Sequence, residues 1–228
     1  MKILIDNADV GVIKQIWAIY PCSGVTTNPS ILAAVTKEGE NPFDLLQAIR
    51  ELIGDDMELH IQALAKDCDA IVEEAQHIAS KLSGNLYVKI PADREGLKAI
   101  KEVEALGIKT TATGIYSAGQ AILAAKAGAS YLAPYINRME NLGKNAIDEV
   151  DTIQQVLDLY GYDSKIIAAS FKNTSQVLNV ALLGIESVTV APDVLESFMN
   201  DKNVENALDT FRTDFEKAYG NGKTMLDY

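Results

Sequence analysis

The sequence predicts an α/β protein built as a single-domain (β/α)₈ barrel, the TIM-barrel fold, with an extra C-terminal helix. Eight short apolar runs alternate with stretches of helical periodicity, as expected for parallel strands covered by helices. The chain has 228 residues, a length at which such barrels form one domain. An open doubly wound sheet is the alternative, but no Gly-x-Gly-x-x-Gly motif follows the first run.

The predicted strands are short and mostly apolar. They are Lys2–Asp6, Gly24–Thr27, Glu58–Gln62, Leu86–Ile90, Ile108–Thr113, Tyr131–Ala133, Lys165–Ser170 and Ser187–Ala191. No linker, low-complexity stretch or block of charge interrupts the alternation, so residues 1–228 form one predicted domain.

The segments between the strands carry helix signals. Residues suited to capping their N-termini are Asp9, Asn41, Asp93, Ser117 and Asn173. Apolar residues recur at helical spacing over 71–82 and 146–159. After the last strand, helices are expected over 193–199 and about 203–219, and the second of these is the extra C-terminal helix.

Composition excludes several classes of protein. A net charge of −12 argues against nucleic acid or an anionic membrane as the main partner, although it allows an anionic substrate in a local basic pocket. The N-terminus does not resemble a signal peptide, and no apolar run approaches a membrane span. Cys22 and Cys68 form no disulfide framework, which favours a reducing, cytoplasmic location. His60 and His77 lack metal-ligand spacing with them, so no metal or other cofactor is expected.

Polar residues lie at or just beyond the C-terminal ends of seven of the eight predicted strands, where barrels build their active sites. They are Asp6, Thr26, Thr27, Asn28, Gln62, Lys89, Thr113, Tyr135, Arg138, Ser170 and Lys172. Side chains alternate along a strand, so Lys89 shares a face with Tyr87. If that face points inward, polar groups line one mouth of the barrel.

Lys89 is the candidate nucleophile because it ends an apolar strand. It either extends from the strand end to solvent or stays partly desolvated. A free lysine amine is neutral in only about 1 molecule in 2,500 at pH 7, and desolvation raises that fraction. A neutral amine attacks a ketone or aldehyde to form a Schiff base, which needs no metal.

Other strand-end residues have both catalytic and structural interpretations. Tyr135, Gln62 and Thr113 are placed to hold a water for proton transfer, but Tyr135 also suits packing over the rim and Gln62 suits satisfying backbone groups. Arg138 is either a phosphate ligand or a salt-bridge partner of Glu140.

The remaining candidates also have two interpretations. Ser170 and Asn173 lie at a strand-to-helix turn that favours anions, and Asn173 is also a plain helix cap. Asp6 accepts a substrate hydroxyl, pairs with Lys89 or caps the following helix.

Four collinear runs resemble the transaldolase family. They are Gly24-Val25-Thr26-Thr27-Asn28-Pro29-Ser30, Val88-Lys89-Ile90-Pro91, Ala133-Pro134-Tyr135-Ile136-Asn137-Arg138 and Ala169-Ser170-Phe171-Lys172. The resemblance implies a (β/α)₈ barrel, class I aldolase chemistry and no metal. It also implies a homo-oligomer, a decamer of two pentamers in which the C-terminal helix reaches a neighbouring subunit.

The resemblance assigns roles to matching positions. It implies that Lys89 forms the Schiff base, that Asp6 lies near substrate hydroxyls and that Gln62, Thr113 and Tyr135 hold the catalytic water. Binding roles are implied for Thr26 and Asn28 at the dihydroxyacetone end, and for Arg138 and Ser170 at the phosphate end. Whether Lys172 contacts phosphate stays open.

Two residues separate the subgroups of the family. Transaldolases carry glutamate and phenylalanine where this chain has Gln62 and Tyr135, and fructose-6-phosphate aldolases carry the pair found here. The run Asn173-Thr174-Ser175-Gln176 departs from the Thr-Pro-Arg-Gln of those aldolases and lacks their arginine at the phosphate end, which leaves open a donor or acceptor other than that of fructose 6-phosphate. The first hypothesis is a fructose-6-phosphate aldolase; the alternatives are a transaldolase and a non-catalytic sugar-phosphate binding protein.

Overall fold

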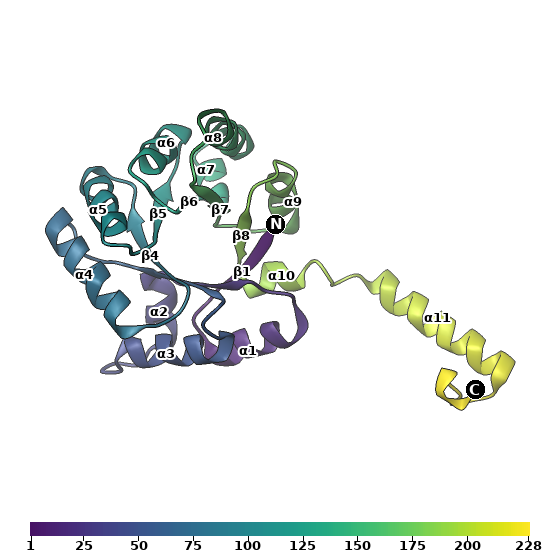
Figure 1. Cartoon of the computed structure of the whole chain (residues 1–228). Helices are drawn as coiled ribbons and strands as arrows, with labels where there is room; N and C mark the ends of the chain where they lie inside the picture. Colours follow the sequence, from purple (N-terminus) through teal and green to yellow (C-terminus); the bar gives the residue numbers. More distant parts are fainter.

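A closed parallel barrel forms the centre of the molecule in a computed structural model that describes residues 1–228. Its strands pair in chain order, and β8 pairs with β1 to close it (Figure 1). The strands are β1 (Lys2–Asp6), β2 (Gly24–Thr26), β3 (Glu58–Gln62), β4 (Leu86–Pro91), β5 (Thr110–Ile115), β6 (Tyr131–Pro134), β7 (Lys165–Ala168) and β8 (Ser187–Val190). The predicted single-domain (β/α)₈ barrel is confirmed.

Helices follow the strands, and all except the long C-terminal one surround the barrel (Figure 1). They are α1 (Val10–Ile19), α2 (Pro29–Val35), α3 (Pro42–Ile53), α4 (Cys68–Lys81), α5 (Arg94–Ala105), α6 (Ala118–Lys126), α7 (Ile136–Asn141), α8 (Ala146–Tyr160), α9 (Thr174–Ala181), α10 (Pro192–Glu196) and α11 (Lys202–Tyr219). The five predicted caps are confirmed, since each side chain accepts a backbone N–H of the first turn. None of the helices combines the length and the apolar character needed to cross a membrane.

Three of the differences from the prediction have a clear local cause. β7 ends at Ala168 because Ser170, two residues later, has φ 64°, which is incompatible with an extended strand. β5 extends to Ile115 because Gly114, with φ 67°, lies within a register shift against β6. α7 was not predicted, since its six residues are too few to show a helical period.

Two apolar cores lie on opposite sides of the strands. The outer core contains 46 buried residues between the strands and the helices. The inner cluster contains only Leu4, Tyr87, Tyr131, Ala133 and Ile167. The other buried side chains that share the inward parity are polar, and they are Thr26, Glu58, His60, Lys89, Thr111, Thr113, Ser187 and Thr189. This barrel therefore encloses polar groups along much of its length.

Two glycines allow the backbone to pack closely around the strands. A Cβ on Gly24 would lie 2.3 Å from the Glu58 carbonyl oxygen, between β2 and β3. A Cβ on Gly96, in the first turn of α5, would lie 1.8 Å from the Pro91 carbonyl oxygen. Any larger residue at Gly96 would displace the end of β4, the strand that carries Lys89.

Candidate active site

A cavity of about 200 Å³ lies at the C-terminal mouth of the barrel. Seven of the ten predicted site residues line it, namely Asp6, Asn28, Lys89, Tyr135, Arg138, Ser170 and Lys172. They lie at or just beyond the ends of five different strands. The expected convergence of polar strand ends at one mouth is therefore confirmed.

The other three predicted site residues lie behind this lining. Thr26 donates to the Asp6 carboxylate at 2.7 Å, and Thr113 and Tyr135 share a hydrogen bond of 2.7 Å between their hydroxyl oxygens. Gln62 is opposite Lys89 in the register of β3 and β4 and remains partly exposed. They contact the lining residues and do not line the cavity themselves.

The Lys89 amine is buried without a carboxylate partner. Its side chain points into the barrel, and the residue is 6 % exposed. Nζ donates to the Thr27 carbonyl oxygen at 2.7 Å. Burial lowers the pKa of Lys89, and the charge of Asp6 opposes this shift only in part. A carbonyl accepts a hydrogen bond from an amine as well as from an ammonium, so this contact allows a neutral, nucleophilic amine.

Two of the three alternatives for Asp6, direct pairing with Lys89 and capping of the following helix, are not found. The Asp6 carboxylate accepts from Thr26, and Asp9, not Asp6, caps α1. Asp6 lines the cavity with Lys89, so its remaining acceptor capacity is available to substrate hydroxyls.

Three neighbouring side chains hold Tyr135. Its hydroxyl bonds Thr113, and its ring makes a T-shaped contact with the Tyr116 ring, with 5.7 Å between centroids. The Arg138 guanidinium lies over the ring at 4.7 Å from the centroid. These contacts fix a phenol at the wall of the cavity that contains the buried amine, where it can exchange protons with a bound molecule.

Arg138 does not form the salt bridge with Glu140 that was one expectation. It donates to the Tyr116 hydroxyl at 3.3 Å, while Glu140 accepts a hydrogen bond from Gln176. No carboxylate pairs with the guanidinium, which is exposed at the cavity. Its charge is therefore available to an anionic group of a ligand.

The turn after β7 is strained and tightly held. Ser170 is the only residue other than glycine with a positive φ, a conformation that costs on the order of 1 kcal/mol. The buried Gln176 side chain accepts from the Lys172 backbone N–H at 2.7 Å and fixes the loop on α9. Lys172 is exposed, and it lines the cavity together with Ser170.

Sequence reasoning missed Thr189, a polar residue near the C-terminal end of β8. Thr189 lines the cavity, and its hydroxyl lies 2.6 Å from that of Thr26. Because Thr26 donates to Asp6, Thr189 is the donor in this second bond. The alternation of Ser187 and Thr189 with two valines was the available signal. The bond from Lys89 to the Thr27 carbonyl could not be predicted from the sequence, because every residue carries a backbone carbonyl.

Comparisons with known proteins agree with this architecture. A solved structure described as "Native KDPGal structure" superposes with a TM-score of 0.57 at 16% identity, and the match covers 84% of this chain and 82% of that chain. At such identity the likeness shows a shared fold alone. The model of the family described as Transaldolase/Fructose-6-phosphate aldolase matches residues 3–226. Because that match spans almost the whole sequence, the chain belongs to the transaldolase/fructose-6-phosphate aldolase family.

Proposed function

We propose that the chain is a class I fructose-6-phosphate aldolase that reversibly splits its substrate into dihydroxyacetone and glyceraldehyde 3-phosphate. Its family supports an aldolase-type enzyme. The observation that carries the finer proposal is the buried amine of Lys89, which is bonded only to a backbone carbonyl in a polar cavity. That environment favours the neutral amine required for attack on a ketone.

The proposed reaction begins when Nζ of Lys89 attacks the C2 carbonyl of the sugar. The carbinolamine hydroxyl takes up a proton and leaves as water, which gives a cationic iminium. A water held by Tyr135 removes the proton of the C4 hydroxyl, the C3–C4 bond breaks, and its electron pair neutralises the iminium as an enamine. The aldehyde leaves, the enamine is protonated at carbon, and hydrolysis of the resulting iminium releases dihydroxyacetone and the free amine.

The pair of Gln62 and Tyr135 favours an aldolase over a transaldolase. A phenol held by Thr113 can donate and accept protons, which a phenylalanine cannot do. A glutamine cannot act as the base that a glutamate provides. Hydrolysis of the three-carbon adduct needs such a proton shuttle, so this pair favours release to water over transfer to a second aldehyde.

The polar groups of the cavity suggest an orientation for the substrate. Asp6 and Asn28 lie near the ends of β1 and β2 and offer contacts for the hydroxyls of the three-carbon end. Arg138, Ser170 and Lys172 lie after β6 and β7 and supply two cations and a hydroxyl for the phosphate. The sugar phosphate would then extend from β1 and β2 toward β6 and β7.

The test is the time course of glyceraldehyde 3-phosphate release from fructose 6-phosphate with no acceptor added. Steady release over many turnovers is the expected result. A burst of about one equivalent per subunit would identify a transaldolase, because the three-carbon unit would remain on Lys89. If nothing is released, borohydride trapping with a panel of sugar phosphates separates another substrate from a protein that only binds.

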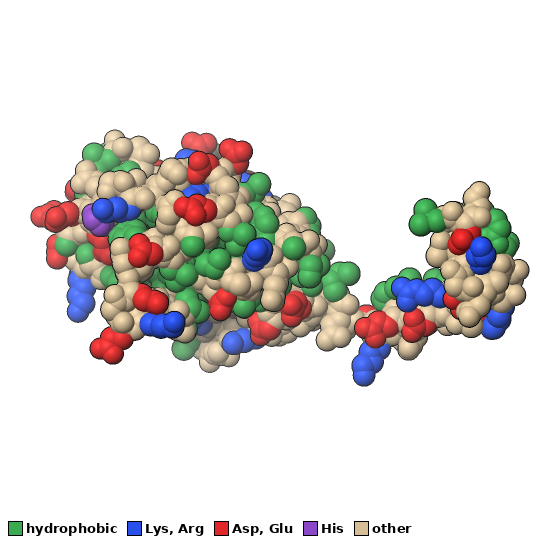
Figure 2. Space-filling model, turned by 90° about the horizontal axis from the view of Figure 1, so that it is seen from below, with side chains coloured by type: hydrophobic (Ala, Val, Ile, Leu, Met, Phe, Trp, Pro, Cys, Tyr) green, Lys and Arg blue, Asp and Glu red, His purple; other side chains and the backbone are tan.

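We also propose that α11 docks on a second copy of this chain, within the homo-oligomer that the resemblance implies. The helix extends away from the barrel (Figure 1), and apolar side chains lie along it outside the main body (Figure 2). Val204, Leu208 and Phe211 share one face and are 54%, 46% and 67% exposed. A helix of 18 residues with an uncovered apolar face is marginal in water, so it needs a partner surface.

Light scattering after size exclusion tests this docking. Leu208→Asp should reduce the mass to that of smaller assemblies, because it places a carboxylate in the apolar face. Asn206→Asp, on the opposite face of α11, is the matched control and should leave the mass unchanged. A wild-type mass of 24.7 kDa, that of one chain, would refute the oligomer.

A further inference from the structure

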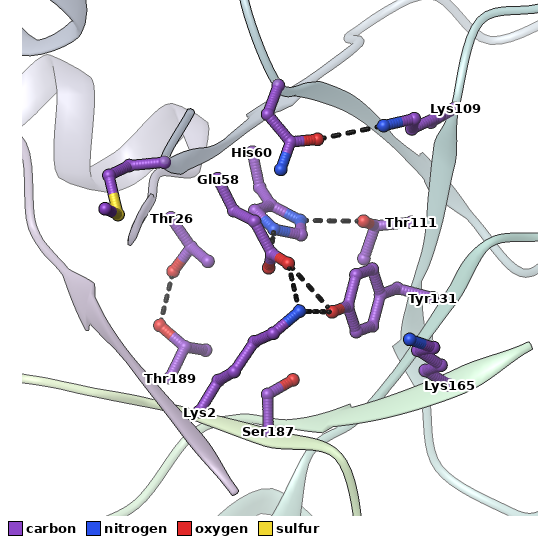
Figure 3. Close-up of polar contacts among 12 residues, drawn as sticks. Lys2, Thr26, Glu58, His60, Lys109, Thr111, Tyr131, Lys165, Ser187 and Thr189 are labelled. Carbon is purple, nitrogen blue, oxygen red and sulfur yellow. Dashed lines mark hydrogen bonds and ion pairs between the residues drawn. The ribbon is translucent and has the colours of Figure 1, made fainter. Parts of the chain in front are cut away.

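A series of polar contacts runs from Lys2 into the interior of the barrel (Figure 3). Lys2, at the N-terminal end of β1, donates to the Glu58 carboxylate at 2.8 Å. The other carboxylate oxygen of Glu58 lies 3.4 Å from His60 Nε2, and His60 Nδ1 lies 2.8 Å from the Thr111 hydroxyl. These contacts therefore connect Lys2, on β1, to Thr111, on β5.

The partners of His60 fix its tautomer. The Glu58 carboxylate only accepts, so Nε2 carries the ring proton that faces it. In the neutral ring, Nδ1 is then an acceptor, and the Thr111 hydroxyl donates to it. His60 is 0 % exposed and stacks on the Tyr87 ring at 4.5 Å, so water cannot replace either partner.

The upper end of this series lies next to Lys89. Thr111 is opposite Lys89 in the register of β4 and β5, and both side chains point inward. His60 precedes Gln62 by one inward position, and Gln62 is opposite Lys89 on the other side. His60 and Thr111 thus form the layer below the amine, and a charge on His60 acts on Lys89 through the low dielectric of the barrel.

Two opposite influences decide whether His60 is charged. Burial and the positive charges of Lys89 and Lys2 lower its pKa, whereas Glu58 raises it. The cation of Lys2 is held at Glu58, where it offsets the attraction of that carboxylate for a proton on the imidazole. Desolvation raises the pKa of Glu58 but is outweighed by its bonds to His60 and Lys2, which leave that pKa at about 2.

The other ionisable groups around this series do not replace Lys2. The Tyr131 hydroxyl donates to Glu58 at 3.0 Å but carries no charge, because its pKa is raised by burial. Lys109 lies over the Tyr87 ring, and Lys165 lies 3.6 Å from Glu186, which also pairs with Lys2. Lys2 is therefore the only cation bonded to Glu58.

We propose that Lys2 is a positioning residue for the reaction at the opposite mouth: by holding Glu58 it keeps His60 neutral, and a neutral His60 allows Lys89 to become a cationic iminium. This inference rests on the proposed function for its catalytic consequence. The charge state of His60 does not depend on that function. An imidazolium beneath the amine would disfavour every cationic state of Lys89, the iminium included.

The first experiment is NMR of the full-length protein with labelled histidine, in which His77→Gln assigns the two imidazoles. The ring nitrogens of His60 should report the neutral Nε2–H tautomer across neutral pH. In Lys2→Met the pKa of His60 should rise by at least about one unit, because Glu58 then keeps its full attraction for the imidazole proton. Lys165→Met, which removes a cation that does not contact Glu58, is the matched control and should leave His60 unchanged.

The second experiment follows Lys89 through the pH dependence of borohydride trapping and of kcat. Lys2→Met should shift the acid limb of trapping down by about one pH unit, because a nearby cation lowers the pKa of the amine. It should lower kcat roughly tenfold, because the iminium is disfavoured. Adding Glu58→Gln to Lys2→Met should restore both, since the carboxylate that charges His60 is gone.

The outcomes separate this proposal from the proposed function. A His60 that stays neutral in Lys2→Met would overturn it, because burial alone would then keep the imidazole neutral without help from Lys2. A wild-type His60 that is cationic at neutral pH would also overturn it. If Lys2→Met does not fold, Lys2→Gln keeps a neutral donor to Glu58 and makes the same test. If no sugar phosphate is cleaved, the NMR result still decides the charge of His60.

Discussion

The two mouths of the barrel both carry polar clusters and lysines, but their hydrogen bonds are organised differently. At the N-terminal mouth, Lys2 is paired with Glu58 and Glu186, and Glu58 also accepts from Tyr131. At the C-terminal mouth, Lys89 has a carbonyl as its only partner. The N-terminal mouth has the larger cavity, about 490 Å³ against about 200 Å³.

This difference shows that cavity size does not identify the reactive end of the barrel. The polar groups of the N-terminal mouth neutralise one another, so they stabilise a charged lysine. Burial does the opposite at Lys89, because it disfavours the ammonium without supplying a bonded carboxylate. The reactive lysine is therefore the one whose neighbours leave part of its hydrogen-bonding capacity unused.

The largest effect that tests this comparison is expected for Lys89→Met. Turnover should fall by about 10⁴-fold or more, because no other amine is buried at the cavity. The adduct trapped by borohydride should disappear from the mass spectrum of the intact chain. Lys109→Met, at the N-terminal mouth, should retain both, and persistence of the adduct in Lys89→Met would remove this lysine from the mechanism.

Tyr135→Phe should have the next largest effect. It removes the hydroxyl bonded to Thr113 and should slow cleavage by roughly 10²–10⁴-fold if the phenol transfers protons. Steady-state kcat is the measurement. Tyr116→Phe keeps the packing against Tyr135 and loses only a hydrogen bond from Arg138, so its kcat should stay close to wild type. Equal turnover in the two variants would exclude Tyr135 as the shuttle.

Thr189→Val should have a smaller effect at the same mouth. It conserves shape and removes the donor to Thr26, whose hydroxyl orients Asp6. A loss of one such hydrogen bond should lower kcat/KM about fivefold. Ser187→Ala lies lower on the same strand, where its hydroxyl donates to the Ile166 carbonyl, and it should not change kcat/KM. A wild-type value for Thr189→Val would show that Asp6 needs no such support.

The smallest effect on turnover is expected for Glu58→Gln, which should instead change stability in acid. The pKa of Glu58 falls from 4.5 to about 2 on folding, so its carboxylate stabilises the fold above pH 4.5. That contribution is lost as the pH falls from 4.5 toward 2. Urea unfolding across this range should show a shallower pH dependence for Glu58→Gln than for wild type. Parallel curves would mean that Glu58 is not ionised by its partners.

Much of the fold followed from local pattern. Apolar runs predicted all eight strands, and Asp93 and Ser117 predicted helix starts, because strand periodicity and capping depend on neighbouring residues. The end of β7 could not be predicted, since it depends on the conformation of Ser170 in a tight turn. The six-residue α7 is fixed by backbone bonds to the turn after β7, which lies far away in the chain.

The sequence by itself determined the barrel, the polar character of its C-terminal mouth and the choice of Lys89 as the central residue. Only the tertiary structure decided how these groups are bonded. It gave Lys89 the Thr27 carbonyl as its partner, linked Thr189 to Asp6 through Thr26, and connected Lys2 to His60 through Glu58. The reason is physical: side-chain type and strand parity are properties of local sequence, whereas hydrogen-bond partners across a barrel depend on register and closure.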